Sequence, residues 1–310
     1  PHSLSSNFVR ACCEDNLGNI WIGTFNGLNR YNKSTGLFQN HTANDIQSDG
    51  LTHSSIWCIV KANQGTRWLG TYFGGVNYFN PEYEIYTRYS YSSNEKQGLS
   101  NPVVGRTIED KNGNLWIGTE GGGLNYFNRR TREFKWYRPQ EGRNSISHNN
   151  VKALYYDADK EIIWIGTHLG GLNRLDIRSG HFTHYRMEDN NRQTLPSDIV
   201  RDIIPYKDLL IVATQNGVCL FEPDSGKCRQ LFKDSKEGKS IKMVADILLD
   251  SEGTLWIAAT GEGVFSYRFD TRKLTNYRHD SANPNSLSNN NVNNIMQDSQ
   301  GHLWFSTSGS

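Results

Sequence analysis

The sequence predicts an all-β protein built as a β-propeller, a ring of four-stranded sheets called blades. The first observation is a repeat, in which an apolar lead residue opens a short strand motif every 45 to 48 residues. A period of that length suits a propeller blade and excludes leucine-rich and ankyrin repeats. The second observation is that no segment shows a sustained helical pattern, so we predict no helix. The lead residues are Trp21, Trp68, Trp116, Trp164, Ile211, Trp256 and Trp304.

Each period is expected to hold four short antiparallel strands joined as a meander. The first strand starts at a β-branched residue and is apolar again three residues later, as at Val151 and Leu154. It ends at a turn such as "EDKNGN", in which Asp, Asn and Gly supply the turn conformations. The second strand is "LWIGT", which is rich in residues that favour pleated sheets. A glycine-containing link, the third strand "GLNYFN", the turn "NRRTRE" and the fourth strand "FKWYR" follow.

The small residue two places after each lead position needs its own explanation. It is glycine in four periods and alanine in the fifth and sixth, for example Gly118 and Ala213. A missing side chain inside a strand usually means that something approaches closely. We expect the inner strands to crowd toward the axis at these positions. The lead tryptophans are then expected to lie between neighbouring blades, where they bury a large apolar area.

Counting lead positions predicts seven blades, of which the last is incomplete. The final copy, "LWFSTSGS", has no third or fourth strand after it, and the first copy begins at its inner strands. We therefore expect one propeller domain over residues 1–310, with six full blades and two inner strands of a seventh, as a fragment of a longer protein. Such a seam should keep an unpaired strand edge.

Composition excludes some classes of function. The 33 basic and 32 acidic residues nearly cancel, which argues against a general nucleic-acid binder. No apolar run approaches the roughly 18 residues of a membrane span, so we expect no membrane contact by this segment. The terminus "PHSLSSNFVR" has neither the basic start nor the apolar stretch of a signal peptide, and localisation cannot be inferred from it.

The five cysteines contain no CxxC pair, and no second cluster of metal ligands has the usual short spacing. We therefore predict neither a metal site nor a cofactor. A disulfide between Cys219 and Cys228, across a predicted hairpin, stays open as an alternative. The favoured interpretation is that the cysteines are buried free thiols that act as small apolar residues.

The motif "D..G.LWIGT..GGLN", followed by linkers such as "NSISHNNV" at 144–151 and "NSLSNNNV" at 285–292, resembles the two-component regulator propeller repeat. The resemblance covers essentially the whole chain and is specific for the second, third and fourth repeats. The fifth and sixth depart from it, because Ile211 replaces tryptophan and "WIAAT" carries an extra residue.

The resemblance implies a sensor. Repeats of this family form the periplasmic sensor region of hybrid two-component histidine kinases, common in Bacteroides-type bacteria, where glycan sensing is the usual role. The family implies a parent protein anchored in the inner membrane, in which a second propeller and an immunoglobulin-like module accompany this one. Signal transduction by phosphorelay would belong to cytoplasmic parts beyond this segment, so the segment itself is not expected to be an enzyme.

Motifs for catalysis are missing from the sequence. There is no G-x-S-x-G elbow, no HExxH pair and no phosphate loop between a strand and a helix. His181 and His184 are expected to face opposite sides of one outer strand, so they cannot easily share a metal. The carboxylates that recur between first and second strands, such as Asp15 and Asp298, are better explained as turn caps. A propeller lyase is retained as the weakest alternative, because the repeats are also distantly similar to streptogramin lyase propellers.

One face of the ring is the candidate binding site. The links after the second strands and the starts of the inner strands should converge there, and they carry residues that do not repeat from period to period. Aromatic faces can cover a sugar ring, and guanidinium groups match carboxylate or sulfate. We predict an oligosaccharide or another polar, anionic ligand. The candidate ligand-binding residues are Arg10, Trp57, Tyr72, Phe73, Arg106, Glu120, Lys152, His168 and Arg201.

Alternatives remain at this stage. The candidate residues could instead point into blade contacts or into solvent. A ligand sensor is favoured, a structural or protein-interaction scaffold without its own ligand comes second, and an enzyme comes last. The outer strands ending at Tyr137, Tyr185 and Tyr277 are best explained as structural covering, with a partner surface, including a homodimer contact, as the alternative. The site could also lie where this propeller meets a following module.

Overall fold

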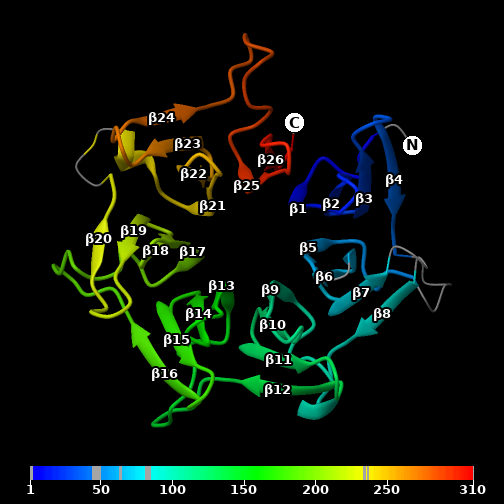
Figure 1. Ribbon diagram of the computed structural model, residues 1–310, viewed down its shortest axis with the longest axis vertical. Coiled ribbons are helices and arrows are strands. Elements are labelled where there is room, and N and C mark those ends of the chain that lie inside the picture. The colour runs from blue at the N-terminus through cyan, green and yellow to red at the C-terminus, as the bar shows by residue number, and fades with distance from the viewer. Residues whose placement is uncertain are drawn as a thin grey trace.

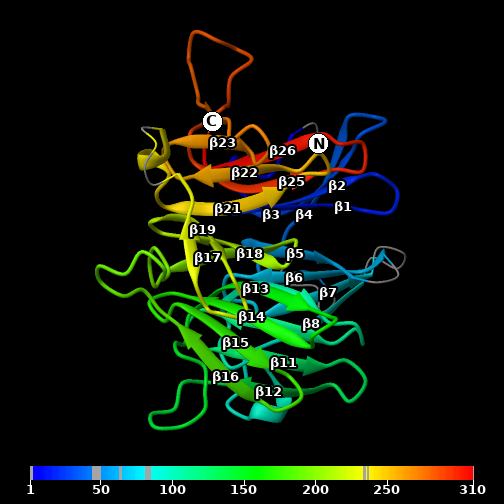
Figure 2. The same cartoon turned by 60° about the vertical axis from the view of Figure 1, so that its left-hand side comes forward.

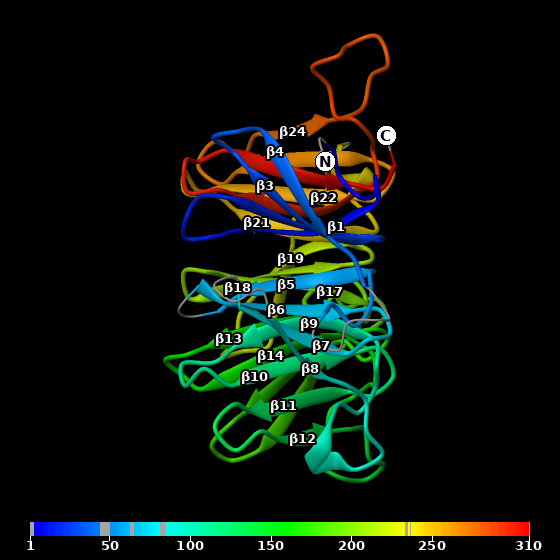
Figure 3. The same cartoon turned by 90° about the vertical axis from the view of Figure 1, so that its right-hand side faces the viewer.

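The computed structural model describes residues 3–43, 50–62, 65–80, 85–232, 235 and 237–309. In this part of the chain, two short 3-10 turns, Glu95–Gln97 and Glu237–Ser240, interrupt an otherwise all-β structure. The predicted propeller is confirmed, because the sheets stand around a central axis with first strands innermost and fourth strands outermost (Figure 1). Turned views show the sheets stacked face to face around the ring (Figures 2 and 3).

Six four-stranded antiparallel sheets follow one another in chain order, as the repeat predicts. The first blade consists of β1 (Val9–Glu14), β2 (Ile20–Thr24), β3 (Gly27–Asn32) and β4 (Leu37–His41). The second consists of β5 (Ile56–Lys61), β6 (Arg67–Thr71), β7 (Val76–Asn80) and β8 (Ile85–Tyr89). The third consists of β9 (Val104–Glu109), β10 (Leu115–Thr119), β11 (Leu124–Asn128) and β12 (Glu133–Tyr137). The fourth blade consists of β13 (Val151–Asp157), β14 (Ile162–Thr167), β15 (Leu172–Asp176) and β16 (His181–Tyr185). The fifth consists of β17 (Val200–Tyr206), β18 (Leu209–Thr214), β19 (Gly217–Phe221) and β20 (Cys228–Gln230). The sixth consists of β21 (Val244–Leu249), β22 (Thr254–Ala259), β23 (Gly263–Arg268) and β24 (Leu274–Tyr277).

The predicted count of seven blades is wrong: the structure has six blades and one two-stranded sheet. This sheet consists of β25 (Val292–Gln297) and β26 (Leu303–Thr307), and it carries the last lead residue, Trp304. It packs between β21 and β1, so it fills the gap in the ring between the sixth and first blades (Figure 1). A tryptophan-led strand motif therefore marks a place in the ring, whereas a blade also requires a third and a fourth strand.

Glycine in the second strand makes room for the neighbouring sheet, as predicted. A Cβ atom on Gly118 would lie 2.5 Å from Cγ1 of Val151, the first residue of the next inner strand. Gly70 stands in the same relation to Val104, at 2.6 Å. Real Cβ contacts are longer than this, so any larger residue here would push neighbouring inner strands apart.

The lead tryptophans pack between neighbouring sheets, as the sequence predicted. Trp21 is 2% exposed and lies against Phe79 of the next sheet, with ring centroids 5.3 Å apart. Trp68 is 1% exposed and meets Phe127 in the same way, at 6.0 Å. Each large side chain thereby joins two sheets that share no strand pairing.

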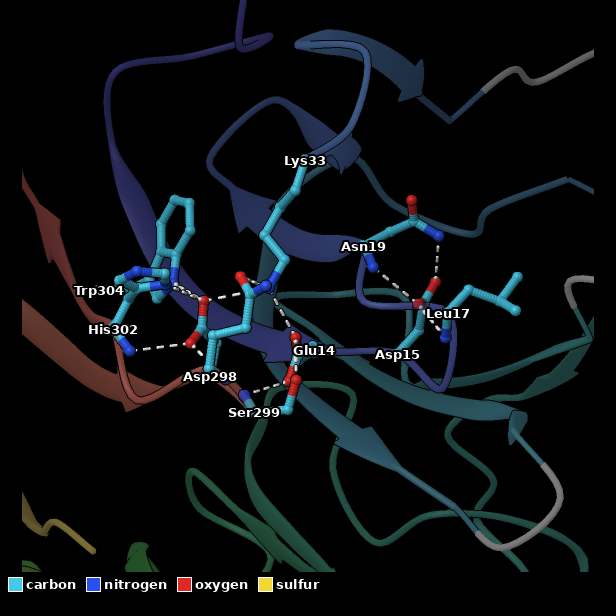
Figure 4. Close-up of polar contacts among 10 residues, drawn as sticks. Glu14, Asp15, Leu17, Asn19, Lys33, Asp298, Ser299, His302 and Trp304 are labelled. Carbon is cyan, nitrogen blue, oxygen red and sulfur yellow. Dashed lines mark hydrogen bonds and ion pairs between the residues drawn. The ribbon is translucent and has the colours of Figure 1, made fainter.

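The recurring aspartates cap the turns between first and second strands, as predicted (Figure 4). Asp15 Oδ1 accepts hydrogen bonds from the backbone N–H groups of Leu17 and Asn19, both at 2.8 Å. Its Oδ2 accepts from the indole Nε1 of Trp21 at 2.9 Å. The carboxylate thus holds the turn and orients the lead tryptophan at the same time.

An equivalent turn cap, Asp298, takes part in the contacts that join the two ends of the ring. Lys33 places Nζ 2.8 Å from Glu14 Oε1 and 3.1 Å from Asp298 Oδ2, and so links the first blade to the turn between β25 and β26 (Figure 4). Burial alone would raise the pKa of Asp298, but hydrogen bonds from Trp304 and Lys33 outweigh it and hold that pKa well below its usual range. We call this cluster of Glu14, Lys33 and Asp298 the seam cluster.

All five cysteines are free thiols, and the favoured interpretation of buried thiols holds for Cys58, Cys219 and Cys228, whereas Cys12 and Cys13 are half-buried; the disulfide alternative is not confirmed. Cys219 and Cys228 are both buried in the packing between the fourth and fifth sheets. Burial raises the pKa of Cys12 to about 11 and that of Cys13 to about 12, so neither is a reactive thiolate. No helix within the described residues is long and apolar enough to cross a membrane.

Candidate functional site

A β-bulge near the start of every inner strand aims side chains at the axis. In β13, Val151 pairs with Thr167 and Ala153 pairs with Gly166, so Lys152 between them has no partner on β14. The same shift in register occurs in each of the seven inner strands. A bulge turns the unpaired residue away from the regular pleat. The bulge residues are Arg10, Trp57, Lys152, Arg201, Ala245 and Asn293, and in β9 the irregular stretch contains Gly105 and Arg106.

These residues enclose a cavity of about 190 Å³ at the mouth of the ring. Six of the nine predicted site residues line it, which places them together as the sequence suggested. The cavity is lined by Arg10, Trp57, Gly105, Arg106, Glu120, Lys152, Arg201, Ala245 and Asn293. We call it the mouth cavity.

An ion pair across the channel supplies the floor of the mouth cavity. Arg106 of β9 reaches Asp246 of β21, on the opposite side of the ring, with Nη2 2.8 Å from Oδ1 (Figure 1). The other oxygen of Asp246 accepts from the backbone N–H of Ile295 at 2.8 Å and from Asn294 Nδ2 at 2.9 Å. Burial, together with the neighbouring Asp202, raises the pKa of Asp246. Arg106 is therefore committed to the protein and closes the channel beneath the mouth.

An aromatic stack forms one wall. The guanidinium of Arg10 lies over the ring of Trp57, 4.3 Å from its centroid. The ring of Tyr72 stacks on that of Trp57, with their centroids 5.3 Å apart and an angle of 10° between their planes. Phe73 meets Tyr72 edge-on at 4.4 Å and is 57% exposed. Tyr72 and Phe73 support and extend the wall but do not line the cavity.

An ion pair between two residues of the protein, Lys152 and Glu120, also lines the cavity. Lys152 Nζ pairs with Glu120, which comes from the link after β10. His168, from the link after β14, lies outside the cavity beside this pair. Burial lowers the pKa of His168, and the nearby cations Lys152 and Arg201 lower it further. At neutral pH this imidazole is therefore an uncharged neighbour rather than a third cation.

Two guanidinium groups of the mouth cavity make no ion pair among the described residues, and Glu120, the carboxylate that acts electrostatically on both, is already paired with Lys152. Arg10 makes its stacking contact with Trp57, and its Nε is buried without a hydrogen bond. Arg201 makes neither a hydrogen bond nor an ion pair with any described residue. Burial lowers the pKa of both arginines, which remain cationic because the guanidinium is so basic. Buried polar groups normally find partners, so these two cations are suited to an anion from outside.

Sequence reasoning missed four contributors: Gly105, Ala245 and Asn293 in the lining, and Asp246 in the floor. The signal was available for the first three, because each directly follows the valine that opens its inner strand, as Lys152 does. Asp246 could not be assigned, since its partner Arg106 lies 140 residues away in the chain. Small residues at two of the positions, Gly105 and Ala245, leave open the space that becomes the cavity.

The site carries binding groups rather than an obvious catalytic set. No group of three or more histidine, cysteine or carboxylate residues in the described parts of the chain could hold a metal ion. A larger cavity, of about 620 Å³, lies on the outer side of the fifth blade, between Met187–Leu195 and Lys239–Lys242. It is an open groove in which acidic Glu188 and Asp189 face basic lysines. The smaller mouth cavity is the better candidate, because it contains two half-buried guanidinium groups that make no ion pair among the described residues.

Four segments match the family model of the two component regulator propeller, at residues 3–26, 98–121, 145–168 and 286–309. This confirms the resemblance for the first, third, fourth and seventh copies, whereas the second copy, which was expected to be among the most specific, is not matched. The family model describes a regulatory repeat rather than an enzyme. No curated protein sequence matches the chain significantly.

Solved structures show the same fold. An extracellular domain assigned to the hybrid two component system BT3049 from B. thetaiotaomicron superposes with a TM-score of 0.85 at 23% identity, over 99% of this chain and 40% of that one. The corresponding domain of BT4673 from B. thetaiotaomicron gives 0.78 at 22% identity, over 99% and 38%. A streptogramin B lyase gives 0.72 at 13% identity, over 99% and 93%. At these identities the likeness concerns the fold, and the chain spans about two fifths of each of the two extracellular-domain chains.

Proposed function

We propose that this chain is a ligand-sensing propeller from the periplasmic region of a hybrid two-component sensor histidine kinase. Its mouth cavity would take a polar ligand with an anionic group, such as an acidic oligosaccharide. A second propeller and an immunoglobulin-like module of the parent protein would read out binding. The parent would be anchored in the inner membrane. The matching regulator repeats and the two extracellular relatives support this placement.

Two arginines without an ion pair carry the proposal for the ligand. Arg10 and Arg201 enter the mouth cavity from inner strands of the first and fifth blades, and Glu120, the carboxylate that acts on both, is held by Lys152. A guanidinium fork binds carboxylate or sulfate through two parallel hydrogen bonds. The ring of Trp57 holds the Arg10 guanidinium in place, and its indole Nε1 is buried without an acceptor. An acidic substituent on a sugar would bind the two guanidinium groups.

A protein-interaction scaffold is the second candidate, and one observation favours it. Large apolar side chains on the mouth face are about half exposed, although such residues are usually buried. They come from links after second strands and from residues just before inner strands, so they surround the mouth. The residues are Phe8, Phe25, Phe73, Leu169 and Met243. A partner module on this face would cover them and the mouth together.

A thermal-shift screen with matched glycans tests the proposal. Oligosaccharides carrying uronic acid or sulfate should raise the melting temperature by mass action, while neutral oligosaccharides of the same length should not. Salt should weaken the effect, because the contacts are charged. If no acidic glycan stabilises the protein, the scaffold function is favoured. Turnover of a stabilising glycan would favour an enzyme instead.

A further inference from the structure

One position in the second strands is apolar in every repeat except the second. It directly precedes the lead residue, and in the other six copies it holds Ile20, Leu115, Ile163, Leu210, Leu255 and Leu303. In the first, third, fourth, fifth and sixth blades this side chain belongs to the core and is at most 4% exposed. In the second blade it is Arg67, which is 2% exposed. A charge at a core position is unfavourable unless it is paired, so this exception to the repeat needs a reason.

The turn before Arg67 also departs from the repeat. Asp15 and Asp110 cap the corresponding turns of the first and third blades, but Ala62 occupies this position in the second. The backbone of the turn is unchanged, because the N–H of Ala62 donates to the carbonyl of Thr66 at 2.9 Å, as that of Asp15 donates to Asn19. The second blade therefore lacks a carboxylate in the place where it has an additional guanidinium.

Arg67 contacts the first blade, where it is only partly satisfied. Its guanidinium carbon lies 4.2 Å from the centroid of the Trp21 ring, and its Nη2 lies 3.4 Å from Asp15 Oδ2. That oxygen already accepts from Asn19 Nδ2 and from the indole of Trp21, both at 2.9 Å. Burial raises the pKa of the neighbouring Cys13 to about 12, so this thiol is uncharged. Nε and Nη1 of Arg67 are buried without a hydrogen bond, which leaves two donors for another acceptor.

A second arginine lies beside the same tryptophan. Arg30 of β3 stands opposite Trp21 in the strand pairing, and its guanidinium carbon lies 5.8 Å from the centroid of that ring. Its Nε is buried without a hydrogen bond, and no described residue forms an ion pair with it. Burial lowers the pKa of Arg67, and the positive charge of Arg30 lowers it further. Two neighbouring cations that share so little negative charge favour an anion between them.

Both guanidinium groups line one cavity of about 420 Å³ between the first and second blades. It is formed at the turns that follow the inner strands, so it lies on the opposite face of the ring from the mouth cavity. One carboxylate, Asp15, and two guanidinium groups line it, which leaves one positive charge in excess. Asn16 and Tyr78 add polar groups and an aromatic ring to the lining. We call it the arginine cavity.

We propose that the arginine cavity is a second ligand site, which binds a small organic molecule through a single carboxylate group. The carboxylate would accept hydrogen bonds from Arg67 and Arg30 and would neutralise the excess charge. The volume falls within the range of small-molecule sites, so the rest of the ligand has room beside Tyr78. This role explains why the second repeat has an arginine where the others have leucine or isoleucine. The site is independent of the mouth cavity and of the ligand proposed there.

Titration of the protein with small anions tests the proposal. Benzoate and glucuronate are the probes, each replacing chloride at constant ionic strength, and sulfate distinguishes a carboxylate site from a general anion site. We expect at least one of the two monocarboxylates to raise the melting temperature and to bind in calorimetry. Arg30→Met should lower its affinity at least about tenfold. Arg174→Met is the matched control and should bind normally, because Arg174 stands opposite Trp164 in the fourth blade as Arg30 stands opposite Trp21.

Arg67→Leu separates a binding role from a structural one. Leucine occupies the equivalent buried position in other blades, and replacing a buried charge by an apolar side chain is often neutral or stabilising. Without a ligand the variant should therefore keep the wild-type urea midpoint or exceed it, while its monocarboxylate affinity falls at least about tenfold. A lower midpoint together with unchanged monocarboxylate affinity would show that Arg67 is structural and would overturn the proposal.

The mouth cavity supplies the remaining comparison. Arg201→Met should leave monocarboxylate binding intact, even if it abolishes binding of an acidic glycan. If monocarboxylate binding is lost in Arg201→Met but kept in Arg67→Leu, the anion binds at the mouth and the proposal is wrong. Absence of binding by all three anions would also overturn it. Tighter binding of sulfate than of either monocarboxylate would refute the assignment of the ligand as a carboxylate.

Discussion

At the residue scale, the bulge in each inner strand decides which side chains reach the axis. Lys152 and Arg201 lie in the mouth cavity because neither has a partner on the adjacent strand. Arg106 differs from them, since its ion pair with Asp246 makes it part of the floor. Removing Arg106 would leave a buried carboxylate unpaired, so a binding defect in that variant would follow from damage to the structure. Arg201 and Trp57 are cleaner probes of binding.

With an acidic glycan found by the screen, Arg201→Met should lower affinity by about 10- to 150-fold, because a charge-assisted contact contributes roughly 1.5–3 kcal/mol. Trp57→Ala should also weaken binding, by removing the ring that holds the Arg10 guanidinium in place. Calorimetric titration measures both effects, and a melting curve for each variant checks the fold. Arg130→Met, at an exposed position on a turn between outer strands, is the matched control and should bind normally. Normal affinity of both mouth variants would remove the ligand from this cavity.

At the element scale, stability comes from side chains that join sheets without sharing hydrogen bonds. The second strands are almost fully buried, and each places its lead residue against the next sheet. Glycine two positions after the lead residue lets the neighbouring inner strand approach, as Gly118 does for Val151. The two features act together, since the tryptophan contact forms only when the strands approach closely.

Trp116→Ala should cost on the order of 3–5 kcal/mol of unfolding free energy, as for other large buried side chains. Trp256→Ala should cost clearly less, because Trp256 is partly exposed and lacks a third-strand partner. Urea titration of the two variants beside the wild type makes the comparison. Trp116→Ile should fall between Trp116→Ala and the wild type, since Ile211 fills the equivalent position in the fifth blade. Equal losses for Trp116→Ala and Trp256→Ala would contradict the asymmetry between the two junctions.

At the scale of the whole molecule, the ring closes between a blade and a two-stranded sheet, and the seam cluster holds this junction. Lys33 contacts Glu14 on its own sheet and Asp298 on the other. Cys12 and Ser306 add a side-chain contact of 3.1 Å across the same junction. No ladder of strand pairing joins β1 to β25, so these polar contacts act together with the packing of Trp304 on Tyr31 and the isolated bridge between Phe8 and Ser308 to hold the ends together.

Acid should loosen this junction. The folded-state pKa of Asp298 lies below its ordinary value of 3.8, so its stabilisation is fully present above that value and is lost as pH falls through the folded-state pKa. Asp298→Asn should therefore lower stability at neutral pH, by about 1–3 kcal/mol, and make less difference in strong acid. Urea midpoints measured from pH 7 down to pH 2 test this, with the exposed Asp224→Asn as the control. A constant difference between Asp298→Asn and the wild type across this range would show that ionisation of Asp298 is not involved.

The repeat was sufficient to predict the strand order, the inter-sheet tryptophans, the glycine clearance and the turn caps. These features depend on neighbours within one period or on the same position in the next, so a regular pattern reports them. Six of the nine candidate site residues also fell in one cavity, because every inner strand starts at the same mouth. Tyr72, Phe73 and His168 were placed only approximately, since the direction of a link side chain depends on contacts that no periodicity encodes.

The sequence by itself determined an all-β ring of repeated sheets with its variable residues gathered on one face. Tertiary structure alone decided that Arg106 crosses the channel to Asp246, while Arg10 and Arg201 make no ion pair among the described residues. The sequence predicted two inner strands after the sixth blade, and the structure shows that they form a separate two-stranded sheet, β25 and β26, and not a seventh blade. The physical reason is the range of the interactions. Strand formation and packing of a repeat follow from local pattern, whereas charge pairing across the axis depends on residues from opposite sides of the ring.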